Sequence, residues 1–171
     1  MTDQPGSPDL AGLVTRLRAA GTEVLALRSA VEVGEPWPLS DHFGVEPEAR
    51  WGPSETLAHL AEMLPFWTGE VERVLAGRAG PTPFGRVASN DLRIGIIERD
   101  RTLPARELFA RVESGVGRLA GRLEELDVAA AGRLGRHPTL GDMPVAAIVA
   151  RFVVDHLEEH AVQLRAVLGS G

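Results

Sequence analysis

The stretch that decides the fold is Asp-His-Leu-Glu-Glu-His-Ala-Val-Gln, residues 155–163, inside a strongly helical segment that runs from Val145 to Leu168. It places His156 and His160 four residues apart. On an α-helix, residues i and i+4 share one face with Cβ atoms about 5–6 Å apart, so both imidazoles can reach one metal ion. We therefore expect the rest of the chain to bring a third ligand to this pair.

The same segment has two helical rows. The first mixes apolar and polar members at spacings of three and four residues: Val145, Val149, Phe152, His156, His160, Gln163 and Val167. This spacing predicts a helix whose mixed row faces the bundle interior. A buried imidazole or amide without a partner costs roughly 1–3 kcal/mol, so the polar members need a metal, a ligand or a hydrogen-bond network. The second row is expected to pack either within the bundle or across a dimer: Leu157, Ala161, Leu164 and Leu168.

Three earlier segments also show apolar residues at helical spacing, and Pro/Gly-rich breaks separate them. The residues expected to open or cap the four helices are Ser7 with Pro8, Gly52 with Pro53, Thr102 with Pro104, and Asp142. Residues 34–51, 77–90 and 132–144 are expected to be loops, and residues 90–100 a short helix. No segment alternates strongly enough to compete as a strand. The sequence thus predicts an all-α four-helix bundle.

Composition limits the classes of function. With 171 residues and 44% apolar content, we expect a single domain over residues 1–171, with residues 1–6 flexible. The net charge of −6 argues against nucleic-acid and anionic-membrane binding, and no apolar run approaches the roughly 18 residues of a membrane span. The absence of cysteine excludes disulfides and cysteine-ligated zinc, and is consistent with a cytoplasmic protein.

The remaining histidines differ in position. His59 lies beside the apolar stripe of the second predicted helix, where it faces a neighbouring helix or the edge of the core. His42 and His137 lie in predicted loops, and a lone histidine is more often structural than a ligand. His59, on a predicted helix at the edge of the core, is therefore a candidate ligand.

These residues carry a resemblance to a known family. The pattern Trp-x7-His at residues 51–59, the His-Pro-x-x-Gly-x-Met segment at 137–143 and the His-x3-His-x2-Gln motif at 156–163 resemble the DinB-like superfamily of four-helix-bundle metalloproteins. The resemblance covers nearly the whole chain. It implies a metal site formed by His59, His156 and His160.

Three neutral imidazoles suit Zn²⁺, Ni²⁺ or Fe²⁺ and leave positions open for water or substrate. A bound ion can acidify water to a pKa near 7 or activate a thiol. The resemblance implies a metal-dependent hydrolase, or a thiol-dependent transferase or isomerase such as those that use mycothiol, acting on a small molecule. The alternative is a non-catalytic metal- or ligand-binding bundle, including a homodimeric one. An enzyme needs polar groups near the metal, and the candidates are Glu62, Arg86, Arg93 and Gln163.

Two rival motif assignments are weaker. Residues 156–160 match the inverted zinc-protease pattern His-x-x-Glu-His, but that fold needs a further ligand well downstream and only 11 residues follow His160. A di-iron carboxylate bundle needs Glu-x-x-His pairs. The residues three before the candidate histidines are instead Thr56, Val153 and Leu157.

Other polar and aromatic residues receive structural assignments. Gln163 is expected to be a hydrogen-bonding partner rather than a ligand. The carboxylates at Glu62, Asp155 and Glu159 can accept hydrogen bonds from ligand imidazoles, but solvated helix charges are the more common case. The tryptophans are expected to serve as packing or as pocket walls: Trp37, Trp51 and Trp67.

Overall fold

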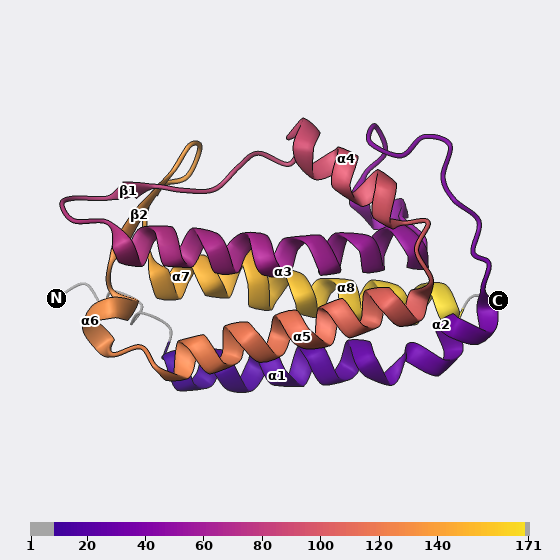
Figure 1. The fold of residues 1–171 in the computed structure, drawn as a ribbon, viewed down its shortest axis with the longest axis horizontal. Helices are drawn as coiled ribbons and strands as arrows, with labels where there is room; N and C mark the ends of the chain where they lie inside the picture. The colour runs from indigo at the N-terminus through magenta and orange to yellow at the C-terminus, as the bar shows by residue number, and fades with distance from the viewer. Residues whose placement is uncertain (1–8, 170–171) are drawn as a thin grey trace, which may run out of the picture.

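The computed structural model describes residues 9–169, and these form a four-helix bundle (Figure 1). The long helices are α1 (Leu10–Ala26), α3 (Pro53–Ala76), α5 (Ala105–Glu124) and a fourth made of α7 (Val145–Val149), the π-helical turn η2 (Ala150–Val154) and α8 (Asp155–Leu168). The shorter elements are α2 (Arg28–Gly34), the 3-10 turn η1 (Glu48–Arg50), α4 (Asp91–Asp100) and α6 (Val128–Ala131). The predicted bundle is confirmed. Among these helices none is long and apolar enough to cross a membrane.

The direction of the helices brings α3 beside the fourth helix. Figure 1 shows α1 and the fourth helix running one way, and α3 and α5 the other. The chain returns along the bundle through α4, which crosses over α3, so that α3 and α5 are parallel. α3 packs against both α5 and the fourth helix. The early turns of α3 therefore lie beside α8.

The core is built from the predicted apolar stripes. Fully buried members from the four long helices include Leu17, Leu60, Leu64, Leu119 and Val153. Gly115 permits the close approach of α5 to α3, because a Cβ there would lie 2.8 Å from Cβ of Leu64.

The two rows of the fourth helix have different surroundings. The second row packs within the bundle, since Leu157, Ala161 and Leu164 are buried among the core side chains. The row that carries His156 and His160 divides: Val145 and Val149 are buried in the core, whereas His156 and Gln163 are partly exposed at its edge. A dimer across the second row is not needed to bury it, and dimerisation stays a prediction.

Two predicted loops contain a small sheet that the sequence did not indicate. Its strands are β1 (Thr82–Pro83), β2 (Leu134–His137) and β3 (Gly141–Pro144), in the order β1-β2-β3 with a parallel and then an antiparallel pair. Such short strands show no alternation in sequence. The prediction of Asp142 as a helix cap is wrong: it pairs with Arg136 across the β2–β3 hairpin at 2.7 Å, and the helix begins at Val145.

The other predicted helix starts have mixed outcomes. α3 begins at Pro53, as predicted. Thr102 does not cap α5, which begins three residues later at Ala105. The N–H of Ala105 instead donates to the carboxylate of Glu35 at 2.7 Å. This cap comes from a residue 70 positions earlier, so no local motif reveals it.

The first helix begins later than expected. α1 starts at Leu10, and the carboxylate of Asp9 accepts hydrogen bonds from the N–H groups of Ala11 and Gly12. Ser7 and Pro8, with the expected flexible residues 1–6, lie outside the described residues.

Candidate metal centre

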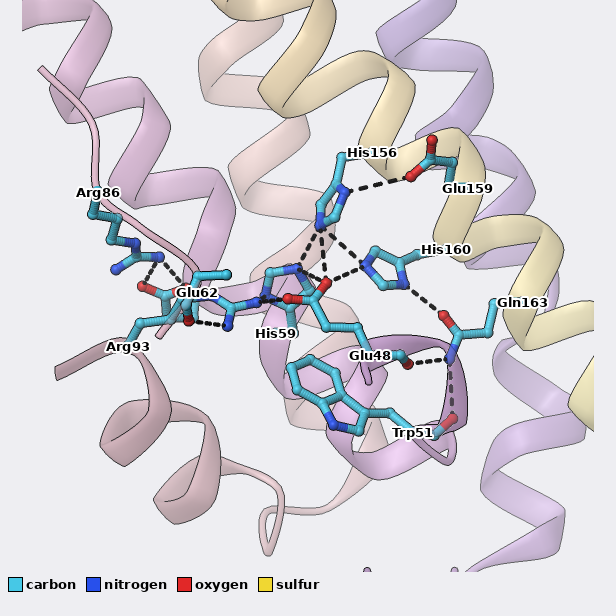
Figure 2. A network of polar contacts seen from close by, with 11 residues as sticks. Glu48, Trp51, His59, Glu62, Arg86, Arg93, His156, Glu159, His160 and Gln163 are labelled. Atoms are coloured by element: carbon cyan, nitrogen blue, oxygen red, sulfur yellow. Dashed lines mark hydrogen bonds and ion pairs between the residues drawn. The ribbon is translucent and has the colours of Figure 1, made fainter. Parts of the chain in front are cut away.

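Three histidines converge between α3 and α8 (Figure 2). His59 lies in the second turn of α3, and His156 and His160 lie in the first two turns of α8. The Nε2 atom of His156 is 2.8 Å from Nε2 of His59 and 3.1 Å from Nε2 of His160. The structure thus brings together the three histidines that the sequence singled out, because the early part of α3 lies beside α8.

A carboxylate that the sequence did not single out completes the cluster. Glu48 lies in η1, within the segment that connects α2 to α3, and Figure 2 shows its carboxylate pointing at the three imidazoles. Its Oε2 atom is 3.5 Å from Nε2 of His156, 3.7 Å from that of His160 and 3.9 Å from that of His59. No helical spacing relates Glu48 to the histidines, so periodicity could not have found it.

The four residues fit a divalent metal ion. Their candidate ligand atoms all lie within 4.8 Å of one another. A tetrahedral ion with bonds of about 2.0–2.1 Å separates its ligand atoms by about 3.3 Å. The separations given above, from 2.8 to 3.9 Å, bracket that value. Imidazole nitrogens and a carboxylate oxygen are also the donors that zinc and similar ions accept.

Gln163 orients one imidazole. Its amide nitrogen donates to the backbone carbonyls of Glu48 at 2.8 Å and Trp51 at 3.1 Å, so its oxygen must face His160. That oxygen is 2.8 Å from Nδ1 of His160. Nδ1 therefore carries the proton, and Nε2 presents its lone pair to the cluster, which is the tautomer that a metal ligand needs.

Arg93 anchors the carboxylate. Its guanidinium pairs with Oε1 of Glu48 and donates to the carbonyl of Ala88 at 3.0 Å. It also lies 3.3 Å from Nδ1 of His59, and because arginine cannot accept a hydrogen bond, this contact favours the proton of His59 on Nε2. Metal binding through Nε2 of His59 requires the opposite tautomer. The contact with Arg93 must then loosen, while the pairs with Glu48 and Ala88 can still hold the guanidinium.

Burial and neighbouring charges favour the protonation states in which these side chains can bind a metal ion. Burial raises the pKa of Glu48, but a hydrogen bond from His160 in its cationic form and the charge of Arg93 outweigh it and lower this pKa to about 2. Burial lowers the pKa of His59 well below its ordinary value, and the cationic forms of its neighbours act in the same direction. Burial also lowers the pKa of His156. Glu48 is thus an anion beside neutral His59 and His156 near pH 7.

A cavity of about 170 Å³ opens beside His59 and His156. Trp67 and Phe152 form one wall, stacked with ring centroids 4.4 Å apart. The remaining lining residues are Glu48, Arg86, Val87, Ala88, Arg93 and Arg151. A small molecule in this cavity would therefore lie beside the histidine cluster.

Three guanidinium groups line the cavity, and two of them are neutralised. Arg86 pairs with Glu62 at 2.6 Å, and Arg93 pairs with Glu48. Arg151 is exposed and forms no ion pair with another described residue. The expectation that Glu62 is a solvated helix charge is wrong, because its side chain is 4% exposed and paired with Arg86.

The other acidic candidates are more exposed than Glu62. Asp155 is half exposed and pairs with Arg16 of α1 at 2.8 Å. Glu159 is 75% exposed and lies 3.6 Å from Nδ1 of His156. Both have the solvated positions that we expected.

The two remaining histidines stand apart from the cluster. His42 is exposed in the segment before η1. His137 is buried in β2 between Phe84 and Phe152. Neither belongs to the group of residues that could share a metal ion.

The π-helical turn η2 directly precedes the histidine pair. A π-turn inserts extra chain into a helix and occurs often at functional sites. Val153 and Val154 at the end of η2 and Leu157 in α8 take the fully buried positions, and His156 lies at the edge of the cavity.

A four-helix bundle with a histidine-rich, metal-compatible cluster between its second and fourth long helices defines the structural class. The chain belongs to the DinB superfamily, whose family model matches residues 6–164.

Two solved structures share the fold. The mycothiol-dependent maleylpyruvate isomerase is 20% identical, with a TM-score of 0.69 over 92% of this chain and 61% of that one. The chain therefore spans less than two thirds of that isomerase. YfiT from Bacillus subtilis, described as a probable metal-dependent hydrolase with an unusual four-helix bundle topology, is 16% identical, with a TM-score of 0.70 over 99% of this chain and 91% of that one. No curated protein matches by sequence.

Proposed function

We propose that the protein is a metal-dependent enzyme that acts on a small molecule, with His59, His156 and His160 as metal ligands. The observation that carries this proposal is the convergence of three Nε2 atoms beside a cavity of about 170 Å³ that His59 and His156 line. A purely structural metal site is closed on all sides by protein, whereas a catalytic one adjoins space for substrate.

The chain's own residues hold and shape this site. The three imidazoles would hold the ion, Gln163 keeps His160 in the tautomer that a ligand needs, and Arg93 holds Glu48 beside the cluster. A divalent ion bound here would supply Lewis acidity, lowering the pKa of water or of a small thiol. The aromatic wall excludes water on one side of the cavity.

The cavity favours a small substrate with an anionic group. Arg151 offers an unpaired positive charge, and the metal ion adds to it, whereas Arg86 and Arg93 are already neutralised. Trp67 and Phe152 line the cavity and provide apolar surface for the rest of the molecule.

Both types of reaction implied by the family remain within the proposal. YfiT's description supports hydrolysis, and the isomerase's name supports a low-molecular-weight thiol such as mycothiol as cosubstrate. The imidazole nitrogens of the site suit Zn²⁺, Ni²⁺ or Fe²⁺ as the metal ion.

The test combines metal analysis with a substrate panel. Protein purified without added metal is analysed for bound ions, stripped with a chelator, and assayed with esters and electrophiles in the presence and absence of small thiols. We expect turnover that disappears on stripping and returns with one of the three ions. Turnover that survives complete removal of metal would refute the proposal. Tight metal binding without turnover would instead favour the non-catalytic bundle.

A further inference from the structure

Glu48 holds a position that the three-histidine site does not require. Its Oε2 atom lies 3.5–3.9 Å from all three Nε2 atoms, and its Oε1 atom pairs with Arg93. Its side chain and that of His156 are each 28% exposed, whereas those of His59 and His160 are 3% and 5% exposed. Glu48 is thus an accessible member of the cluster, and it is carried by a short connecting turn, whereas the histidines are carried by long helices.

We propose that Glu48 is a fourth, exchangeable metal ligand, which closes the site in the absence of substrate and yields its position to an incoming small-molecule ligand. This inference rests on metal binding by the three histidines. It adds a ligand from the α2–α3 connection, outside the two helices that carry the histidines.

The distances support ligation by Glu48. Four donors around one tetrahedral ion lie about 3.3 Å apart, and Oε2 is within 0.6 Å of that separation from each histidine, taking 3.9 Å as its longest distance. A carboxylate used only for charge balance has no reason to be nearly equidistant from three nitrogens. The described residues therefore present one oxygen and three nitrogens to a common centre.

The surroundings support exchange of Glu48 rather than permanent closure. Glu48 lines the cavity, so a molecule that enters beside His59 and His156 meets this carboxylate. Arg93, also in the wall, holds Oε1 and can retain the carboxylate when Oε2 leaves the ion. The backbone need not move, because the Glu48 carbonyl stays bound to the amide of Gln163. A rotation of one side chain is enough to open the site.

The test compares Glu48→Gln with Asp41→Asn. Both variants lose one carboxylate from the α2–α3 connection, but Asp41 is exposed and outside the cluster. Circular dichroism spectra and thermal melts of the metal-free proteins establish that each variant folds. Co²⁺ then serves as a spectroscopic probe of coordination, and its dissociation constant is measured by competition with a chelator.

If Glu48 is a ligand, E48Q changes the Co²⁺ absorption spectrum and weakens Co²⁺ binding by about tenfold or more. Even residues that only hydrogen-bond to a metal ligand change metal affinity by about 10–100-fold. D41N should have the wild-type Co²⁺ spectrum and the wild-type Co²⁺ affinity. An E48Q protein with the wild-type spectrum and affinity overturns the inference. Wild-type protein that binds no Co²⁺, Zn²⁺, Ni²⁺ or Fe²⁺ refutes the proposed function itself, so the two failures are distinguishable.

A titration of the Co²⁺ form with 2-mercaptoethanol tests exchange. The thiol must displace Glu48 in the wild type but finds a weaker competitor in E48Q, so we expect it to bind the variant several-fold more tightly. Equal thiol affinity in wild type and E48Q shows that Glu48 does not yield its position, and overturns the exchange. A second variant, Glu48→Ala, repeats both measurements without an amide oxygen that could replace the carboxylate.

Discussion

His160 and His137 are buried to nearly the same extent, with 4% and 5% of the residue exposed, yet their surroundings differ. His160 has a partner for each ring nitrogen: Gln163 at Nδ1 and the histidine cluster at Nε2. His137 accepts a hydrogen bond from the N–H of Thr139 at Nδ1, and its buried Nε2 has no hydrogen-bond partner among the described residues. Burial alone therefore does not distinguish a ligand from a packing residue.

The ring contacts reinforce this difference. His137 stacks on Phe152 with centroids 5.1 Å apart and meets Phe84 edge-on at 5.5 Å. His160 packs edge-on against two other imidazoles, at 4.5 and 5.0 Å. An imidazole between aromatic rings contributes packing, whereas imidazoles that face one another leave lone pairs aimed at a common point. The atoms that the second ring nitrogen faces therefore distinguish a candidate metal ligand from a packing histidine.

The largest expected effect is that of His160→Ala. The variant removes one ligand, and we expect metal affinity to fall by more than about a hundredfold. This is more than the loss of about 10–100-fold that follows removal of a residue that only hydrogen-bonds to a ligand. Stripping metal from the wild type should also lower its thermal midpoint, because an ion that binds only the folded state stabilises it. The variant should show no such shift. Metal titration and calorimetry measure both effects.

His42→Ala is the matched control, since His42 is exposed and outside the cluster. Retention of wild-type metal affinity by H160A would contradict the assignment. A loss of affinity in H42A would mean that the cluster is not the binding site.

His137→Ala should give the opposite pattern. It removes a ring packed between Phe84 and Phe152 and leaves a cavity, so we expect the free energy of unfolding to fall by about 2 kcal/mol. Metal affinity should stay within about twofold of wild type, because no ligand changes. Urea unfolding of the metal-free protein and metal titration check the two halves. A large loss of metal affinity in a folded H137A protein would show that the two histidine environments are not independent.

Gln163→Leu should produce a smaller change in the metal site. The variant removes the acceptor that holds the proton of His160 on Nδ1, and we expect metal affinity to fall on the order of tenfold. Nitrogen-15 NMR of the metal-free protein should show a mixture of His160 tautomers in the variant and one tautomer in the wild type. An unchanged tautomer with weakened binding would assign the effect to the lost contacts with Glu48 and Trp51 instead.

The bundle and the pair His156 and His160 were predictable because both follow helical periodicity, and the family resemblance added His59. The i, i+4 spacing fixes His156 and His160 on one face, and His59 lies beside the stripe that packs toward them. The structure places the three together, as expected from the family resemblance, while metal binding itself stays a proposal.

What the sequence did not reveal depends on partners far along the chain. Asp142 and Thr102 both have the residue type of a helix cap, but Arg136 pairs with Asp142 and Glu35 supplies the cap of α5. Glu48 lies in an aperiodic connection, so no spacing rule links it to histidines 11 and more positions later. Propensity and period describe local structure, and these residues obtain their roles from tertiary contacts.

Arg151→Gln should have the smallest effect. It tests whether the cavity beside the cluster binds an anionic group, which the aromatic packing around His137 leaves no room for. Benzoate and benzamide share their size and shape but differ in charge, and calorimetry of the metal-loaded protein compares their binding. An exposed ion pair contributes about 0.2–1 kcal/mol, so R151Q should weaken benzoate binding about 1.4- to fivefold and leave benzamide unchanged. Arg165→Gln is the control, because Arg165 lies on the same helix and pairs with Glu23 outside the cavity. Equal weakening of both compounds by R151Q would point to a change of cavity shape, and weakening of benzoate by R165Q would point to the general charge of the protein. Only selective weakening by R151Q supports Arg151 as the residue that receives the anionic group of a substrate.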